Sequence, residues 1–238
     1  NDSGNTSEIF EIKAGSSYIK KTFQTGLKNI DWEAITNDGE NFYVGEFGNN
    51  LGTRKDLKVY QIPFRNDSVI VDSIKTIPFF YPEQTDFMPK NINNNFDAEA
   101  MIFLGGNIHL FTKEWITNTV SHYVIDKNLT ENQPAKKLET FDTGFVVTDA
   151  SFFDNKLYVV GYTKKASVYL MIFEKDETGN LFFNKPLKKF SLGRAFSIGQ
   201  IEGITATEKG VYISGERFNI KIKKVPQSLY FISYKDLE

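Results

Sequence analysis

The stretch DWEAITNDGENFYVGE, from Asp31 to Glu46, is the main evidence for the architecture, because its pattern occurs four times in the chain. The other copies are DAEAMIFLGGNIHLFT (97–112), TDASFFDNKLYVVGY (148–162) and IEGITATEKGVYISGE (201–216). Each copy has an acid, a small residue, a short alternating run, a turn and a second alternating run, which is typical of a β-hairpin. The aligned acids are Glu33, Glu99, Asp149 and Glu202. A repeat of about 50 to 65 residues predicts stacked or radial units.

More β-rich sequence follows each hairpin. LKVYQI and SVIVDSIKTIPFF follow the first copy, whereas only SLYFISYKD follows the fourth. The N-terminal segment EIFEIKAGSSYIKKTFQTG can supply the missing strand. We therefore predict an all-β fold, a single β-propeller of four-stranded antiparallel blades whose ring is closed by the N-terminal strand. Four repeats are detected, so the ring has four or five blades. A β-sandwich also contains hairpins, but it need not repeat an acid at the same place.

The ends of the chain suggest its domain limits and its compartment. Residues 1–7 are small and polar, and we predict a disordered tail there, with the propeller domain spanning 8–238. The chain starts with Asn1 rather than Met, which is typical of a protein that has lost a signal peptide or been trimmed. A lipidated Cys could precede residue 1. We expect an extracytoplasmic protein: periplasmic, an outer-membrane lipoprotein or secreted.

Composition excludes several classes of function. The net charge of −2 offers no basic field for phosphates, so we expect no nucleic-acid partner. No apolar run approaches the length of a membrane span. The chain has no Cys, which excludes disulfides, thiolate metal sites and a Cys nucleophile. Its two histidines, His109 and His122, lack the spacing of a zinc site.

Several segments in order resemble a known group of proteins. NIDWEAI, NFYVGEFGNN, FDAEAM, GFVVTDASF, IEGIT and VYISGER are similar to segments of uncharacterised extracytoplasmic bacterial β-propellers, many of them lipoproteins or secreted proteins. The D-x-E-A and E-G-I pieces also resemble phytase-like and gluconolactonase-like propellers. This wider resemblance implies Ca²⁺ sites and hydrolysis of sugar lactones or phosphate esters. The further Asn and Asp ligands of the gluconolactonase pattern have no clear counterpart here.

The recurring acids mark the candidate site. In a propeller, the innermost strands start at one mouth of the central channel, so the four acids should converge there. The candidate ligand-binding residues are Glu33, Glu46, Asn49, Arg54, Glu99, Lys113, Asp149, Tyr162, Glu202, Glu216 and Arg217. The candidate metal ligands are Glu33, Glu99, Asp149 and Glu202.

Like charges that converge must be neutralised, and three solutions remain open. In the first, cations such as Lys113, Arg54 and Arg217 form structural salt bridges with the acids. In the second, the carboxylates and nearby amides bind Ca²⁺, which takes about 6–8 oxygen ligands. In the third, one carboxylate acts as a base in a pocket where Trp115 and Tyr162, with Trp32, stack on a sugar ring. The loop from Gly45 to Arg54 is either an anion-holding loop or a simple turn.

These patterns lead to two functional hypotheses. The first is a binding module that uses the channel mouth to hold a small molecule, a glycan or a protein partner. The alternative is a Ca²⁺-dependent hydrolase of a sugar lactone, ester or phosphate. The sequence leaves open whether the protein is an enzyme, and it identifies no catalytic residue.

Overall fold

Antiparallel sheets make up almost all of the regular structure. The computed structural model describes residues 4–16, 18–220 and 223–238. Part of the predicted N-terminal tail, residues 1–3, lies outside the described residues, and the first strand begins at Glu8. The chain divides into two compact units, one of residues 1–110 and 124–136, the other of residues 111–123 and 137–238. The boundary between the units crosses the second sheet.

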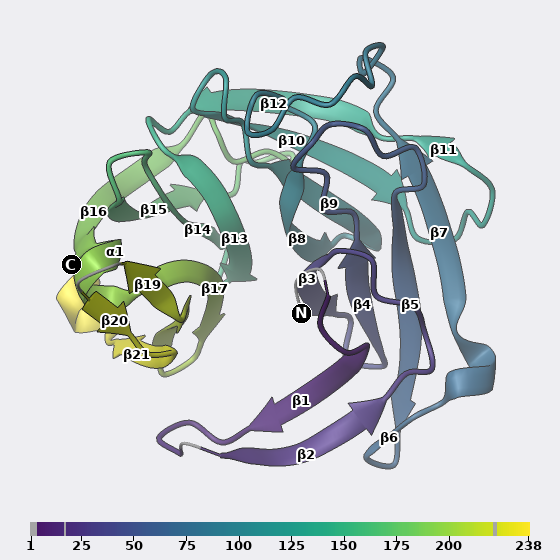
Figure 1. Cartoon of the computed structure of the whole chain (residues 1–238), viewed down its shortest axis with the longest axis horizontal. Coiled ribbons are helices and arrows are strands. Elements are labelled where there is room, and N and C mark those ends of the chain that lie inside the picture. Colours follow the sequence, from purple (N-terminus) through teal and green to yellow (C-terminus); the bar gives the residue numbers. More distant parts are fainter. Residues whose placement is uncertain (1–3, 17, 221–222) are drawn as a thin grey trace. The chain divides into compact units, whose positions relative to one another are not determined.

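The first and second sheets follow the hairpin-plus-strands plan of the repeat. In the first sheet, β3, β4, β5 and β7 lie side by side in this order, as Figure 1 shows, and the short β11 adds to β7 in parallel. Its strands are β3 (Trp32–Asn37), β4 (Asn41–Glu46), β5 (Lys58–Arg65), β6 (Ser68–Val69), β7 (Lys75–Phe80) and β11 (Gln133–Pro134), and the 3-10 helix η1 (Val71–Ser73) follows β6. The second sheet has the order β12-β10-β9-β8 and comprises β8 (Ala98–Leu104), β9 (Asn107–Thr112), β10 (Thr119–Asp126) and β12 (Lys136–Asp142).

The third and fourth sheets belong to the second unit. The third has the order β13-β14-β15-β16, with β13 (Val146–Phe153), β14 (Lys156–Tyr162), β15 (Ser167–Glu174) and β16 (Pro186–Arg194). The fourth has the order β17-β18-β21, with β17 (Gln200–Thr207), β18 (Gly210–Glu216) and β21 (Ser228–Ile232). The remaining elements of this unit are α1 (Ala195–Ile198), β19 (Phe218–Ile220), β20 (Lys223–Val225) and η2 (Tyr234–Leu237).

These sheets confirm the predicted fold class. The described residues form four antiparallel blade sheets, one for each sequence repeat, which is the plan of a four-bladed β-propeller. Apolar side chains of the strands form the core of each unit. In the first unit Trp32, Val44, Tyr60 and Ile62 pack together. In the second unit, residues such as Leu170 pack with residues of the fourth sheet in one apolar cluster.

The predicted closure of the ring by the N-terminal strand is wrong. Among the described strands, β1 (Glu8–Ile12) pairs with β2 (Ile19–Gln24) alone, and the fourth sheet keeps three strands. Pairing across a short turn costs far less loop-closure entropy than pairing with a strand at the other end of the chain. The hairpin also has its own apolar contacts, because Ile9 packs on the cluster around Trp32 and Phe23 meets Phe64 edge to face at 5.1 Å.

A β-bulge recurs at the start of three hairpins. In the first, Trp32 pairs with Glu46 and Ala34 with Gly45, so Glu33 is the extra residue. In the fourth, Glu202 is the extra residue between Ile201 and Gly203. In the third, the extra residue is Thr148, not Asp149. A bulge sets two residues opposite one and redirects the side chain of the extra residue. The bulges therefore determine the local direction of the Glu33 and Glu202 side chains.

Candidate functional site

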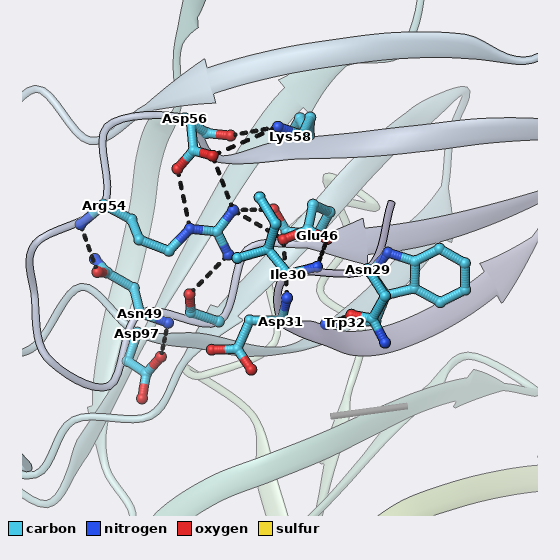
Figure 2. A network of polar contacts seen from close by, with 11 residues as sticks. Asn29, Ile30, Asp31, Trp32, Glu46, Asn49, Arg54, Asp56, Lys58 and Asp97 are labelled. Carbon is cyan, nitrogen blue, oxygen red and sulfur yellow. Dashed lines mark hydrogen bonds and ion pairs between the residues drawn. The ribbon is translucent and has the colours of Figure 1, made fainter. Parts of the chain in front are cut away.

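Glu46 and Arg54 form a buried ion pair in the first unit (Figure 2). The Glu46 side chain is fully buried, and its two oxygens accept hydrogen bonds from the backbone N–H groups of Ile30 and Asp31 at 2.8 and 3.1 Å. Arg54 Nη2 lies 2.8 Å from Glu46 Oε1, and Arg54 Nε donates to Asp56 at 3.0 Å. The pair therefore ties the start of β3 to the loop that follows β4.

The charges around Arg54 are mutually compensated. Burial alone would lower the pKa of Arg54, but the hydrogen bonds and negative charges of Asp56 and Glu46 outweigh it and raise that pKa. The hydrogen bond from Arg54 lowers the pKa of Asp56. The guanidinium also donates to the carbonyl of Gly48 at 3.0 Å. Its donors are thus directed at groups of this chain, which favours the structural interpretation of these two predicted site residues.

The loop from Gly45 to Arg54 is built as a turn. The Asn49 side chain accepts a hydrogen bond from the backbone of Arg54 at 2.9 Å, and its own backbone N–H donates to Asp97 at 2.6 Å. Asn94, from the long loop between β7 and β8, donates to the carbonyl of Asn49 at 3.2 Å. Gly52 has a φ of +71°, the left-handed region that glycine adopts readily. The hydrogen bonds of Asn49 therefore stabilise the loop, which favours the interpretation as a turn.

Acidic side chains gather around this loop. A Cβ atom at Gly48 would lie 2.3 Å from Glu33 Oε1 and 2.4 Å from Asp31 Oδ2, so the two carboxylates converge on the bare glycine backbone. Asp97 contacts the next residue of the loop through its hydrogen bond with the Asn49 N–H. Glu99, in β8, is buried in the same unit. Sequence reasoning missed Asp31 and Asp97, although each stands two residues before a repeated acid.

The second unit brings together a different set of predicted residues, which we call the Trp115 cluster: Lys113, Trp115, Tyr162, Lys164, Gln200 and Glu202. The Lys113 ammonium lies 5.7 Å from the centroid of the Trp115 ring and 5.6 Å from that of Tyr162. The two rings are 6.2 Å apart, and Lys164 lies over Trp115 at 5.8 Å. Lys113 is only 5% exposed and Trp115 8%. Such cation–π contacts stabilise a lysine that has little water around it.

A polar network adjoins these rings. Tyr162 donates its hydroxyl proton to Glu202 Oε1 at 3.2 Å, and Gln200 donates to the same oxygen at 2.6 Å and to the Tyr162 hydroxyl at 3.1 Å. All three side chains are half-buried, so one edge of the cluster reaches solvent. The Trp115 indole N–H is buried and has no hydrogen-bond acceptor among the described residues. The cluster thus combines flat aromatic faces, two cations and a hydrogen-bonded carboxylate.

Asp149 is held differently from Glu202. Its carboxylate accepts hydrogen bonds from the backbone N–H groups of Ile204 at 2.7 Å and Ala150 at 2.8 Å. The bulge position in this repeat belongs to Thr148, which is buried and donates to the carbonyl of Ile201 at 2.7 Å. The predicted equivalence of Asp149 with Glu33 and Glu202 is therefore wrong by one residue. Asp149 instead joins β13 to β17.

Glu216 and Arg217, the last two predicted residues, are exposed at the end of β18. Glu216 pairs with Gln200 in the ladder, whereas Glu202 lies opposite the step from Ser214 to Gly215. Gln200 and Lys164 were not predicted, and only their short spacing from Glu202 and Tyr162 could have indicated them.

Metal binding has no compact ligand set in the described part of the chain. Within residues 4–16, 18–220 and 223–238, no group of three or more His, Asp or Glu side chains lies close enough to hold an ion. The four predicted metal ligands fall in both units, with Glu33 and Glu99 in the first and Asp149 and Glu202 in the second. The Ca²⁺ prediction stays a prediction. Among the described helices, none is long and apolar enough to cross a membrane.

Comparisons with known proteins give a distant structural likeness. No family model and no curated protein matches the chain. Among solved structures, it is similar to a "putative 6-phosphogluconolactonase" from Bacteroides uniformis, with a TM-score of 0.45 and 11% sequence identity. The match covers 95% of this chain, which spans 60% of the length of that protein. A likeness at this level carries no argument about activity.

Proposed function

We propose that the protein is a ligand-binding module and that the Trp115 cluster is its binding site. The observation that carries the proposal is the buried Lys113, whose ammonium contacts the rings of Trp115 and Tyr162 beside the carboxylate of Glu202 and the amide of Gln200. Binding sites commonly combine apolar or aromatic surface with a few convergent polar groups. The proposal keeps the extracytoplasmic location that the sequence predicts.

The chemistry of the cluster suits a polar, flat ligand with an anionic group. Tyr162 is half-buried and offers a rigid aromatic face on which a sugar ring can stack, and the buried Trp115 ring lies behind it at 6.2 Å. Gln200 and Glu202 offer donors and acceptors for hydroxyl groups. Lys164 is exposed, so its positive charge is available at the edge of the cluster. A sugar acid combines these features, and a neutral sugar lacks only the anionic group.

Titration calorimetry with glucuronate and glucose tests the proposal, because the two share a ring and differ in the carboxylate. We expect glucuronate to bind more tightly. Tyr162→Phe keeps the ring but removes the hydroxyl that contacts Glu202, and it should weaken binding about tenfold. Lys164→Gln should weaken glucuronate selectively, while Lys165→Gln at the next exposed position is the matched control. Equal affinities of Lys164→Gln and Lys165→Gln would contradict the proposal.

Measurements on the same purified protein distinguish the binding-module hypothesis from the alternative hydrolase hypothesis. The hydrolase hypothesis requires Ca²⁺ in the native protein and a lactonase, esterase or phosphatase activity that chelation abolishes. It also requires Glu33→Gln or Glu202→Gln to eliminate that activity. The module hypothesis expects no metal by elemental analysis and sugar binding that persists in chelator. Chelator-sensitive turnover would replace the proposal with the hydrolase.

A further inference from the structure

A cavity separates the N-terminal hairpin from the first sheet. It has a volume of about 210 Å³ and lies between β1 and the β3–β4 hairpin, all within the first unit. Its apolar walls are formed by Ile9, Phe10, Ala34, Ile35 and Val44. Ile35 is 50% exposed, so the cavity opens to solvent on that side. An apolar cavity of about 150 Å³ can hold benzene, so this volume admits a somewhat larger molecule.

Trp32 is a wall residue of this cavity and carries a buried hydrogen-bond donor. Its side chain is only 4% exposed and lines the cavity, and its indole N–H has no hydrogen-bond acceptor among the described residues. The ring is fixed, because it packs at 6.4 Å against Tyr60 and its backbone N–H donates to Asn29 at 3.1 Å. A buried donor without an acceptor is destabilising, and a ligand that carries an acceptor would recover that free energy.

Specific hydrogen bonds hold the N-terminal segment, which forms one side of the cavity, in place. The buried Thr25 hydroxyl donates to the carbonyl of Ser7 at 2.6 Å, just before β1 begins. Asn29 donates to the carbonyl of Asn5 at 3.3 Å, and Gln24 donates to Glu8. The N-terminal segment is thus tied to the connection between β2 and β3. The cavity therefore results from the way in which the β1–β2 hairpin is fixed against the first sheet.

Carboxylates set the charge preference of the cavity. Glu8 from β1 and Glu33 from β3 both line it, and none of the cationic side chains in the described part of the chain does. A ligand with its own carboxylate would meet like charges in a partly apolar surrounding, which disfavours it. A neutral ligand avoids this repulsion.

We propose that this cavity is a second ligand site, which takes a small neutral molecule with an apolar body and one hydrogen-bond acceptor for the Trp32 indole N–H. Its residues are separate from those of the Trp115 cluster. It therefore stands or falls independently of the proposed sugar site.

Benzamide and benzoate test the proposal, because they share a shape and an acceptor but differ in charge. The chain has two Trp residues, so a nitrogen–proton correlation spectrum contains two indole N–H signals, assigned with Trp115→Phe. Benzamide should shift the Trp32 signal saturably and leave the Trp115 signal unchanged. Benzoate should bind at least about tenfold more weakly, because of the two carboxylates.

A pair of variants completes the experiment. Ile35→Phe enlarges an exposed wall residue and should weaken benzamide at least about tenfold by filling the opening. Ile19→Phe makes the same change at an equally exposed residue of β2 outside the cavity, and should bind as the wild type does. A Trp32 signal that does not shift, equal binding of benzoate, or unchanged binding in Ile35→Phe would overturn the proposal.

Discussion

Replacing Glu46 by Gln should destabilise the first unit by about 3 kcal/mol. The amide keeps the shape of the side chain but offers one acceptor oxygen where the carboxylate offers two. A backbone N–H of Ile30 or Asp31 then faces a donor, and such a buried unsatisfied group costs about 1–3 kcal/mol. Arg54 also loses a charge partner, and breaking a buried pair costs about 3–5 kcal/mol. The two costs overlap, because both come from the loss of the same carboxylate, and Arg54 keeps its contact with Asp56, so we expect a total near the lower end of the second range.

Urea unfolding measures this loss. In a Trp115→Phe background, the fluorescence reports Trp32, which pairs directly with Glu46 across the hairpin. With a slope of about 3 kcal/mol per molar urea, the unfolding midpoint should fall by about 1 M. Glu216→Gln is the matched control, because Glu216 ends the same hairpin of the fourth repeat but is exposed. Its cost should stay below about 1 kcal/mol. Equal midpoints for the two variants would refute the reasoning.

Three further outcomes follow from named groups. Burial raises the pKa of Asp38, but hydrogen bonds from Tyr43 and from nearby backbone N–H groups outweigh it and hold that pKa far below its usual value. Asp38→Asn should therefore lower the free energy of unfolding by a constant amount above about pH 4, and by less as the pH falls further. Urea midpoints of the wild type and the variant, measured at several pH values, test this. Burial lowers the pKa of His122 despite its contact with a carboxylate, so stability should decline below about pH 6.5, and His122→Phe should flatten this decline. Gly161→Ala should destabilise the protein by about 3 kcal/mol, because its Cβ would lie 1.9 Å from a backbone carbonyl oxygen. Gly48→Ala should destabilise it by about 1 kcal/mol, because only the ends of flexible side chains must move. Equal melting temperatures of these two variants would contradict the argument.

The repeat could be predicted from sequence because its signals are local. Turn residues between two alternating runs specify a hairpin, and four copies at similar spacing predict four blades. Closure by the N-terminal strand could not be predicted in the same way. The apolar faces of β1 and β2 are compatible with more than one neighbour, and only the contacts of Ile9 and Phe23 with the first sheet decide between them.

The candidate site was predictable in part. The Lys113 and Tyr162 contacts join residues from separate repeats, so only the fold brings them together. Asp149 was misplaced because a bulge adds one residue to a strand without a clear sequence signal. The role of Arg54 depends on which acid lies within reach of its guanidinium, and Glu46 is 8 positions earlier in the chain, beyond any local pattern.

The recurring bulge has a consequence for engineering with these repeats. A consensus blade or a chimera aligned by residue similarity would superimpose Asp149 on Glu202. Asp149 is paired in its β-ladder, whereas Glu202 is the unpaired residue of a bulge, so the alignment would exchange positions that are not equivalent. The side chains of the following strand would then start on the opposite face of the sheet. Blades can be exchanged within this chain only if the alignment places the bulge residues Glu33, Thr148 and Glu202 at the same position.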